Sequence, residues 1–121
     1  MAGARSILIV EDEPLIAMML EDFLKELGHI VVGIADSRES ALNQVERGGI
    51  DLVILDVHLR GGTTSWPVAD VLADRGIPFL LSTGGSVGPT PPRHAGAPQL
   101  DKPFTMEGVR AALAEAALGQ A

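Results

Sequence analysis

Acidic side chains directly follow two apolar runs of the sequence, in positions where they could bind a cation or act as nucleophiles. Asp56 follows the run at 52–55, and Glu11 and Asp12 follow the run at 7–10. Short apolar runs of this kind are typical of strands buried on both faces of a parallel sheet. Each acid alone could be a turn or helix-capping residue. If the two strands are neighbours, however, three carboxylates meet at the edge where such sheets bind their ligands.

Three carboxylates close together repel one another unless a cation relieves the repulsion, and Mg²⁺ suits oxygen ligands with positions left open. Lys102 and Thr83 stand at the ends of two further apolar segments. A carboxylate with Mg²⁺, a lysine and a hydroxyl is equipped to attack a phosphoryl group, because that transfer depends on positioning and charge neutralisation. The sequence therefore predicts an aspartyl phosphate on Asp56. Thr83 is preferred to its neighbour Ser82 as the hydroxyl because a glycine follows it.

Strand and helix patterns alternate along the chain and predict the frame that positions these residues. Strands are expected at 7–10, 30–35, 51–55, 78–83 and 99–101. Helices are expected at 14–27, from a cap at 36–37 to the glycines at 48–49, near 66–74, and from Thr105 to about residue 118. The economical architecture is α/β, a doubly wound five-stranded parallel sheet with helices on both faces.

The stretch 84–98 does not have the composition of a helix, because eight of its fifteen residues are glycine or proline. Proline removes a backbone donor and biases the residue before it away from helical geometry. We expect a loop or one irregular turn there. The helix between the fourth and fifth strands should therefore be short or irregular.

Composition limits the classes of function. The 121 residues suit a single domain, 1–121, with an aliphatic core, since 46% are hydrophobic and only 3% aromatic, with no tyrosine. A net charge of −7 argues against nucleic-acid binding through a basic surface. The absence of cysteine excludes disulfides and thiolate metal sites. The first apolar run is too short for a signal peptide or a membrane span, so we expect a soluble cytoplasmic protein.

Taken in order, these motifs resemble the receiver domain of two-component response regulators, nearly end to end. Glu11 and Asp12 stand where the family has its acidic pair, and Asp56 stands where it has its phosphoacceptor. Thr83 matches the family's switch hydroxyl, and Lys102 matches its lysine before proline. The resemblance implies a flavodoxin-like fold and a commonly cis bond between residues 102 and 103. It further implies that Mg²⁺ is held by Asp12, Asp56 and the backbone carbonyl of His58, with Glu11 acting largely through water. Lys102 would contact the phosphoryl group and Thr83 would move to bond it.

Three departures from the family pattern stand out. Residues 60–62 are Arg-Gly-Gly where receivers usually carry a proline, and Gln99 stands where many have a mobile aromatic. The stretch 78–84 resembles an alphaproteobacterial subgroup with a Phe-Ala-Thr-Gly-hydrophobic-Tyr motif, often single-domain regulators linked to stress signalling. Gly85 and Ser86 fill the last two places of that motif, so its tyrosine is missing.

The resemblance implies a stand-alone receiver that accepts a phosphoryl group from a sensor histidine kinase or a phosphotransfer protein. We expect it to signal to a downstream protein by binding or onward transfer, with no output domain following and no enzyme activity beyond slow self-dephosphorylation. Family members bind partners, and often dimerise, through the face formed by the fourth connection, the last strand and the last helix. The sequence therefore leaves open whether the protein forms a homodimer.

Two other functions remain open at this stage. One is a pseudo-receiver that binds partners without phosphorylation, which the missing aromatic favours. The other is a small Mg²⁺-dependent phosphohydrolase. A second acid two residues after the nucleophile would support that function, but position 58 is histidine. The three histidines, His29, His58 and His94, lack metal-ligand spacing. We expect them to be solvent-exposed or loop residues, and we expect Trp66 to be a packing residue at a helix start.

Overall fold

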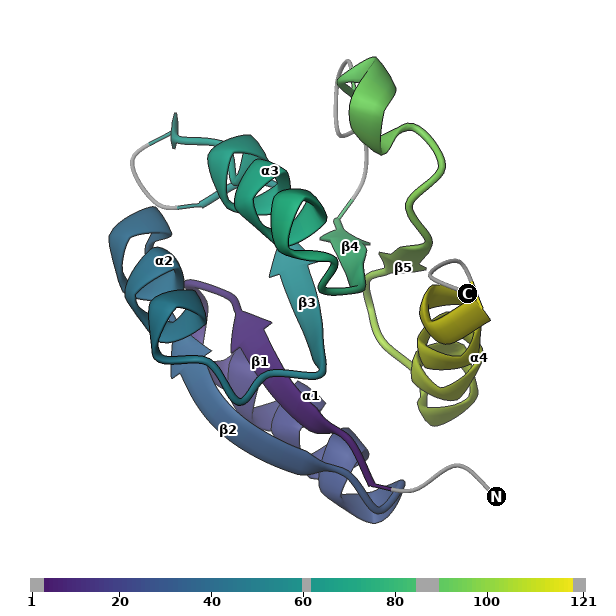
Figure 1. Ribbon diagram of the computed structural model, residues 1–121. Helices are drawn as coiled ribbons and strands as arrows, with labels where there is room; N and C mark the ends of the chain where they lie inside the picture. Colours follow the sequence, from purple (N-terminus) through teal and green to yellow (C-terminus); the bar gives the residue numbers. More distant parts are fainter. Residues whose placement is uncertain (1–3, 60–61, 85–89, 119–121) are drawn as a thin grey trace.

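The expected α/β architecture is confirmed by the structure, a computed structural model that describes residues 4–59, 62–84 and 90–118 (Figure 1). Five strands form one sheet in the order β2-β1-β3-β4-β5, and all neighbouring pairs are parallel. The strands are β1 (Ser6–Val10), β2 (Ile30–Ala35), β3 (Leu52–Asp56), β4 (Phe79–Thr83) and β5 (Gln99–Asp101). The helices are α1 (Pro14–Glu26), α2 (Arg38–Arg47), α3 (Trp66–Arg75) and α4 (Met106–Leu118), with a 3₁₀ turn η2 (Pro92–His94).

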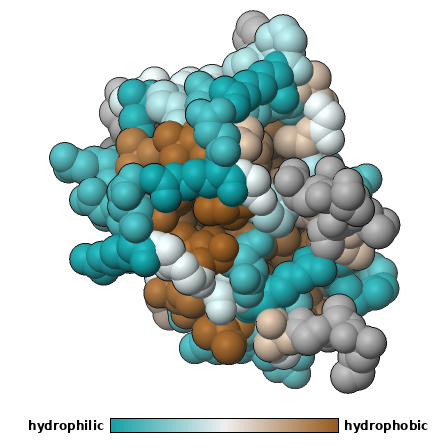
Figure 2. Space-filling model, in the orientation of Figure 1, coloured by the Kyte–Doolittle hydropathy of each residue, from teal (hydrophilic) through white to brown (hydrophobic). Residues whose placement is uncertain are grey.

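Helices cover both faces of the sheet and divide the core into two layers. Helices α1 and α4 pack on one face, and α2 and α3 on the other (Figure 1). The central strands β1 and β3 are apolar on both faces, which is why they appear in the sequence as unbroken runs. On the side of α2 and α3, apolar atoms show between rows of polar side chains (Figure 2).

Local signals in the sequence set most of the helix ends. Pro14 occupies the first turn of α1, as expected, because a missing N–H costs nothing there. The Ser37 hydroxyl accepts a hydrogen bond from the Ser40 amide and caps α2. Gly76 follows α3 in the left-handed conformation, with φ of 71°, which glycine adopts without a steric penalty.

The glycine- and proline-rich connection between β4 and β5 contains one 3₁₀ turn among its described residues, 84 and 90–98, as predicted. The part at 85–89 lies outside the described residues, as do Arg60 and Gly61. His94 lies in this turn and is thus a loop histidine, as expected, but it is buried, with only 3% of its surface accessible. Its ring stacks on Trp66 and meets the edge of Phe79, and its Nε2 lies 2.7 Å from Asp70 Oδ1. Trp66 is thus a packing residue.

Within the described part of the chain, no helix has the length and apolar character needed to cross a membrane.

Candidate functional site

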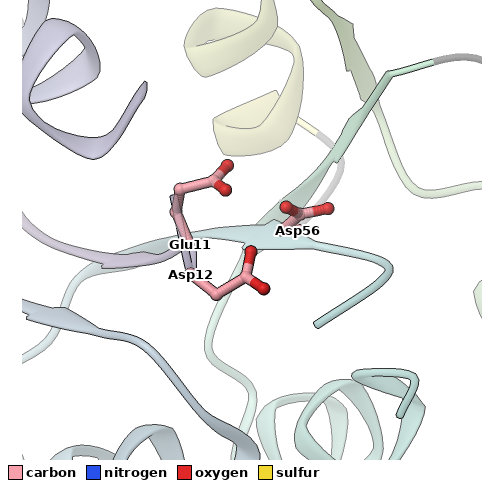
Figure 3. Close-up of side chains that lie close together, drawn as sticks. All are labelled: Glu11, Asp12 and Asp56. Atoms are coloured by element: carbon pink, nitrogen blue, oxygen red, sulfur yellow. The ribbon is translucent and has the colours of Figure 1, made fainter. Parts of the chain in front are cut away.

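Two neighbouring strands bring three carboxylates to the same edge of the sheet. Val10 at the end of β1 pairs with Leu55 on β3, and the residue that follows each of them in the chain is an acid, Glu11 and Asp56. One carboxylate oxygen from each of Glu11, Asp12 and Asp56 lies within 4.8 Å of the others. Figure 3 shows the three side chains around one space. The predicted meeting of these residues is confirmed.

Backbone hydrogen bonds fix the positions of the two buried acids. Glu11 and Asp56 are only 3% and 7% exposed, whereas Asp12 is partly open to solvent. The Glu11 amide donates to Ala35 on β2 at 2.9 Å, and its carboxylate accepts from the Glu13 amide at 3.1 Å. Asp56 Oδ1 accepts from the His58 amide at 3.3 Å. The inner side of the site is therefore buried and hydrogen-bonded to the backbone, and the site is open to solvent at Asp12.

Lys102 reaches across the sheet edge and links the two buried acids. Its Nζ lies 2.9 Å from Glu11 Oε1 and 3.1 Å from Asp56 Oδ2. The backbone holds it there, because its amide donates to the Thr83 carbonyl at 2.8 Å. The following bond to Pro103 is cis, as expected. Burial alone lowers the pKa of the Lys102 ammonium, but its hydrogen bonds to Glu11 and Asp56 outweigh that effect and leave the pKa raised. Lys102 is therefore a fixed positive charge.

The Glu11 carboxyl is harder to ionise than an ordinary glutamate, mainly because it is buried. Burial raises the pKa of Glu11 to about 7, against the opposing hydrogen bond from Lys102, and the charge on Asp56 raises it further. Positive charge near the two buried carboxylates, such as that of Lys102, favours their ionised forms. A set of carboxylate oxygens with an open, solvated side is the kind of donor set that hard divalent cations prefer.

The hydroxyl of Thr83 does not point at Asp56 in this structure. Its Oγ1 donates to Asp101 Oδ1 at 3.2 Å, on the neighbouring strand β5. Ser82, the alternative, pairs in register with Asp56 and is 2% exposed. The sequence analysis missed Asp101, although its place at the end of the strand beside Thr83 could have indicated the contact. The proposed role of the His58 carbonyl stays a prediction, since the structure gives only its amide a bond to Asp56.

Comparison with known proteins gives a consistent result. The response regulator receiver domain matches residues 7–64. SdrG from Sphingomonas melonis, known from a solution structure, is 56% identical, with a TM-score of 0.87 over 97% of this chain and 99% of that chain. The structure of the PhyR stress response regulator is 33% identical, with a TM-score of 0.81 over 97% of this chain and 46% of that chain.

A curated relative, the phyllosphere-induced regulator PhyR of Methylorubrum extorquens, is 39% identical over 84 residues, 66% of this chain. The chain spans only 31% of that protein's length. The similarity to SdrG, by contrast, extends over nearly the full length of both chains. From this likeness and from the arrangement of its strand-end residues, the chain belongs to the response regulator receiver domain family.

Proposed function

We propose that the chain accepts a phosphoryl group on Asp56 from a phosphorylated histidine of a sensor kinase or phosphotransfer protein. The observation that carries the proposal is the position of Asp56, held between a fixed ammonium and two further carboxylates at the ligand-binding edge of the sheet. In the reaction an Asp56 oxygen forms a bond to phosphorus. The nitrogen–phosphorus bond of the donor breaks, and the imidazole nitrogen keeps the electron pair.

Each neighbouring residue has a distinct part in this proposal. Lys102 would contact the phosphoryl oxygens, for which its raised pKa keeps it charged. Thr83 would leave Asp101 and bond the phosphoryl group, and Glu11 would act largely through water. Asp12, Asp56 and the His58 carbonyl would hold Mg²⁺. When bound, Mg²⁺ neutralises the negative charge of the phosphoryl oxygens.

An apolar rim beside the site supports a protein as the donor. Leu15 and Met18 on α1 are 78% and 57% exposed, the largest exposed fractions among the large apolar side chains of the described residues. Met18 and Ile34 also line a cavity of about 450 Å³ together with Glu11 and Asp12. A small-molecule donor would need no such rim, whereas a docking protein would bury it.

Mass spectrometry of the intact protein tests the chemistry. After incubation with acetyl phosphate and Mg²⁺, we expect one added phosphoryl group that is lost on standing. The adduct should be absent without Mg²⁺ and in Asp56→Asn. A folded wild-type protein that forms no adduct and binds no Mg²⁺ would contradict the proposal and favour a binding module that works without phosphorylation.

A substitution on the rim separates docking from chemistry. Leu15→Ser should slow transfer from a phosphorylated kinase domain about tenfold, because a buried apolar contact is lost, while leaving labelling by acetyl phosphate unchanged. Ile30→Ser is the matched control, since Ile30 is another exposed apolar residue, at the opposite end of the strands. Equal effects of both substitutions would rule out the rim as the docking surface.

We further propose that the phosphorylated chain signals through protein contacts or onward transfer and has no catalytic activity beyond slow loss of its own phosphoryl group. SdrG, its close relative in structure, has been solved in a BeF3-activated conformation, to which this chain aligns with a TM-score of 0.81. Beryllofluoride is therefore the probe to use for the activated state of this protein.

A further inference from the structure

Ser82 carries a buried hydroxyl that the proposed chemistry does not use. It is 2% exposed, and its Oγ has no hydrogen-bond partner among the described residues. An unpaired buried hydroxyl destabilises a folded protein, so such a group calls for an explanation. Among the described residues, the other serine buried to this extent is Ser65, and its hydroxyl is paired, because its Oγ donates to the Val57 carbonyl at 3.3 Å.

The sheet places Ser82 beside Asp56. The two residues are register partners on the adjacent strands β4 and β3, and the Val57 amide donates to the Ser82 carbonyl at 3.4 Å. Residues two apart along a strand share a face. Ile54 and Leu80, two positions earlier, both pack in the core layer of α1 and α4. Asp56 and Ser82 therefore project from the same face, on strands about 5 Å apart.

Both Asp56 oxygens already have donors in the unphosphorylated protein. Oδ1 accepts from the His58 amide and Oδ2 from Lys102. Phosphorylation changes this arrangement, because one oxygen becomes the bridging oxygen of an acyl phosphate, the carboxylate charge is lost, and Lys102 turns to the phosphoryl oxygens. The remaining carbonyl oxygen has two lone pairs and can accept a further hydrogen bond from a donor on β4.

We propose that Ser82 supplies that donor, so that its hydroxyl bonds the carbonyl oxygen of the aspartyl phosphate and stabilises the phosphorylated form. This inference rests on the proposed function of Asp56. It makes Ser82 a second hydroxyl of the switch, distinct from Thr83, which ends the same strand and is bonded to Asp101 in this structure. The unpaired hydroxyl is then a cost of the unphosphorylated state that phosphorylation removes.

Ser82→Ala tests the proposal through two effects of opposite sign. Beryllofluoride with Mg²⁺ should bind the variant about tenfold more weakly than wild type, the loss expected for one hydrogen bond, and the aspartyl phosphate should hydrolyse faster. The unphosphorylated variant should melt at the same temperature as wild type or higher, because an unpaired hydroxyl is removed. Ser65→Ala is the control for stability and should melt lower, since its hydroxyl is paired.

A purely structural role for Ser82 would move only the melting temperature. The inference would be overturned if Ser82→Ala bound beryllofluoride as tightly as wild type and its aspartyl phosphate lasted as long. Ser82→Thr keeps a hydroxyl and should retain the affinity better than Ser82→Ala, and the reverse order would also overturn it. If wild type itself binds no beryllofluoride and forms no adduct, the proposed function fails, and this inference fails with it.

Discussion

Lys102 holds two carboxylates together that would otherwise repel each other. Its ammonium lies about 3 Å from both Glu11 and Asp56, where a bound cation would also be attracted. Removing it should therefore raise the affinity for Mg²⁺ while slowing phosphorylation, because the ammonium competes with the metal but supports the transfer. In Lys102→Met we expect Mg²⁺ to bind about tenfold more tightly and acetyl phosphate to label Asp56 more slowly. Calorimetric titration with Mg²⁺ measures the first effect.

Lys25→Met is the matched control for this experiment. Lys25 lies on α1 with an exposed side chain, 3.6 Å from Glu21, so its removal changes the net charge equally without touching the site. Equal gains in Mg²⁺ affinity for both variants would show that overall charge, rather than the local ion pairs, sets the affinity.

His29 gives the protein a pH dependence that is separate from the site. Burial, and then the charge of Arg5, lower the pKa of His29, and its Nδ1 accepts a hydrogen bond from the Arg5 amide at 3.1 Å. Because the folded pKa lies below the ordinary value of about 6.5, the unfolded chain binds more protons in the window between the two values. Stability should therefore rise with pH through that window, be complete above about pH 6.5, and fall below it.

Thermal melting of wild type and His29→Gln between pH 5 and 7.5 checks this dependence. The glutamine cannot titrate, so the variant should lose less stability than wild type on acidification. Parallel curves for the two proteins would show that other groups account for the acid sensitivity.

The residues that could be predicted from sequence are those whose position follows from strand ends. Glu11, Asp56 and Lys102 end or follow apolar segments, and parallel strands bring their carboxyl ends to one edge whatever the details of packing. The hydroxyl of Thr83 was not predictable in the same way. Its direction depends on a rotamer that Asp101 sets from a neighbouring strand, 18 residues away in sequence.

Helix α3 ends at a residue in the left-handed backbone conformation, Gly76, and a substitution there tests how much that conformation depends on glycine. It follows α3 with φ of 71° and ψ of 25°, and a Cβ there would meet no atom within 4 Å. Gly76→Ala should therefore destabilise the fold through the backbone alone, by about 1 kcal/mol, without a steric clash. That corresponds to a fall of roughly 3–6 °C in the melting temperature.

Gly96→Ala serves as the comparison in the same experiment. A Cβ at Gly96 also meets no atom within 4 Å, but this glycine does not have a positive φ. Gly96→Ala should melt at or slightly above the melting temperature of wild type, because alanine reduces the conformational entropy of the unfolded chain. A similar loss in both variants would mean that the left-handed conformation is not the cause.

The helices and strands could be predicted from the periodicity of apolar residues, but the contacts that hold the connection before β5 against α3 could not. Glycine and proline content predicted that this stretch lacks a regular helix, and the described part contains only the turn η2. No local pattern showed that His94 would be buried against Trp66 and Asp70, since both belong to α3. Contacts of this kind depend on the packed fold, which brings the ring of His94 against residues far from it in the sequence.

At the scale of the whole molecule, the order of the strands decides which charges meet. The order β2-β1-β3-β4-β5 places β3 between the two strands that carry the acidic pair and the hydroxyls. The number and alternation of the elements were predictable, and a doubly wound sheet allows few orders that satisfy short, right-handed connections. The choice among those orders required the structure, because it depends on pairing between segments distant in sequence.

The acidic site should also couple metal binding to the stability of the whole fold. Only the folded chain holds Glu11, Asp12 and Asp56 together, so Mg²⁺ should bind it in preference to the unfolded chain. Mg²⁺ at a hundredfold excess over Kd should then stabilise the protein by about 2.7 kcal/mol. The measurement is the melting temperature as a function of Mg²⁺ concentration.

General screening must be separated from specific binding, because a chain with a net charge of −7 is stabilised by any salt that reduces self-repulsion. KCl at matched ionic strength measures the screening part. Asp56→Asn removes one repelling charge and could raise the melting temperature by itself, so the comparison rests on the slope against Mg²⁺ concentration. That slope should be nearly lost in Asp56→Asn and Asp12→Asn but kept in Asp22→Asn, whose carboxylate is exposed on α1. Equal slopes in all three variants would place the stabilising Mg²⁺ outside the predicted site.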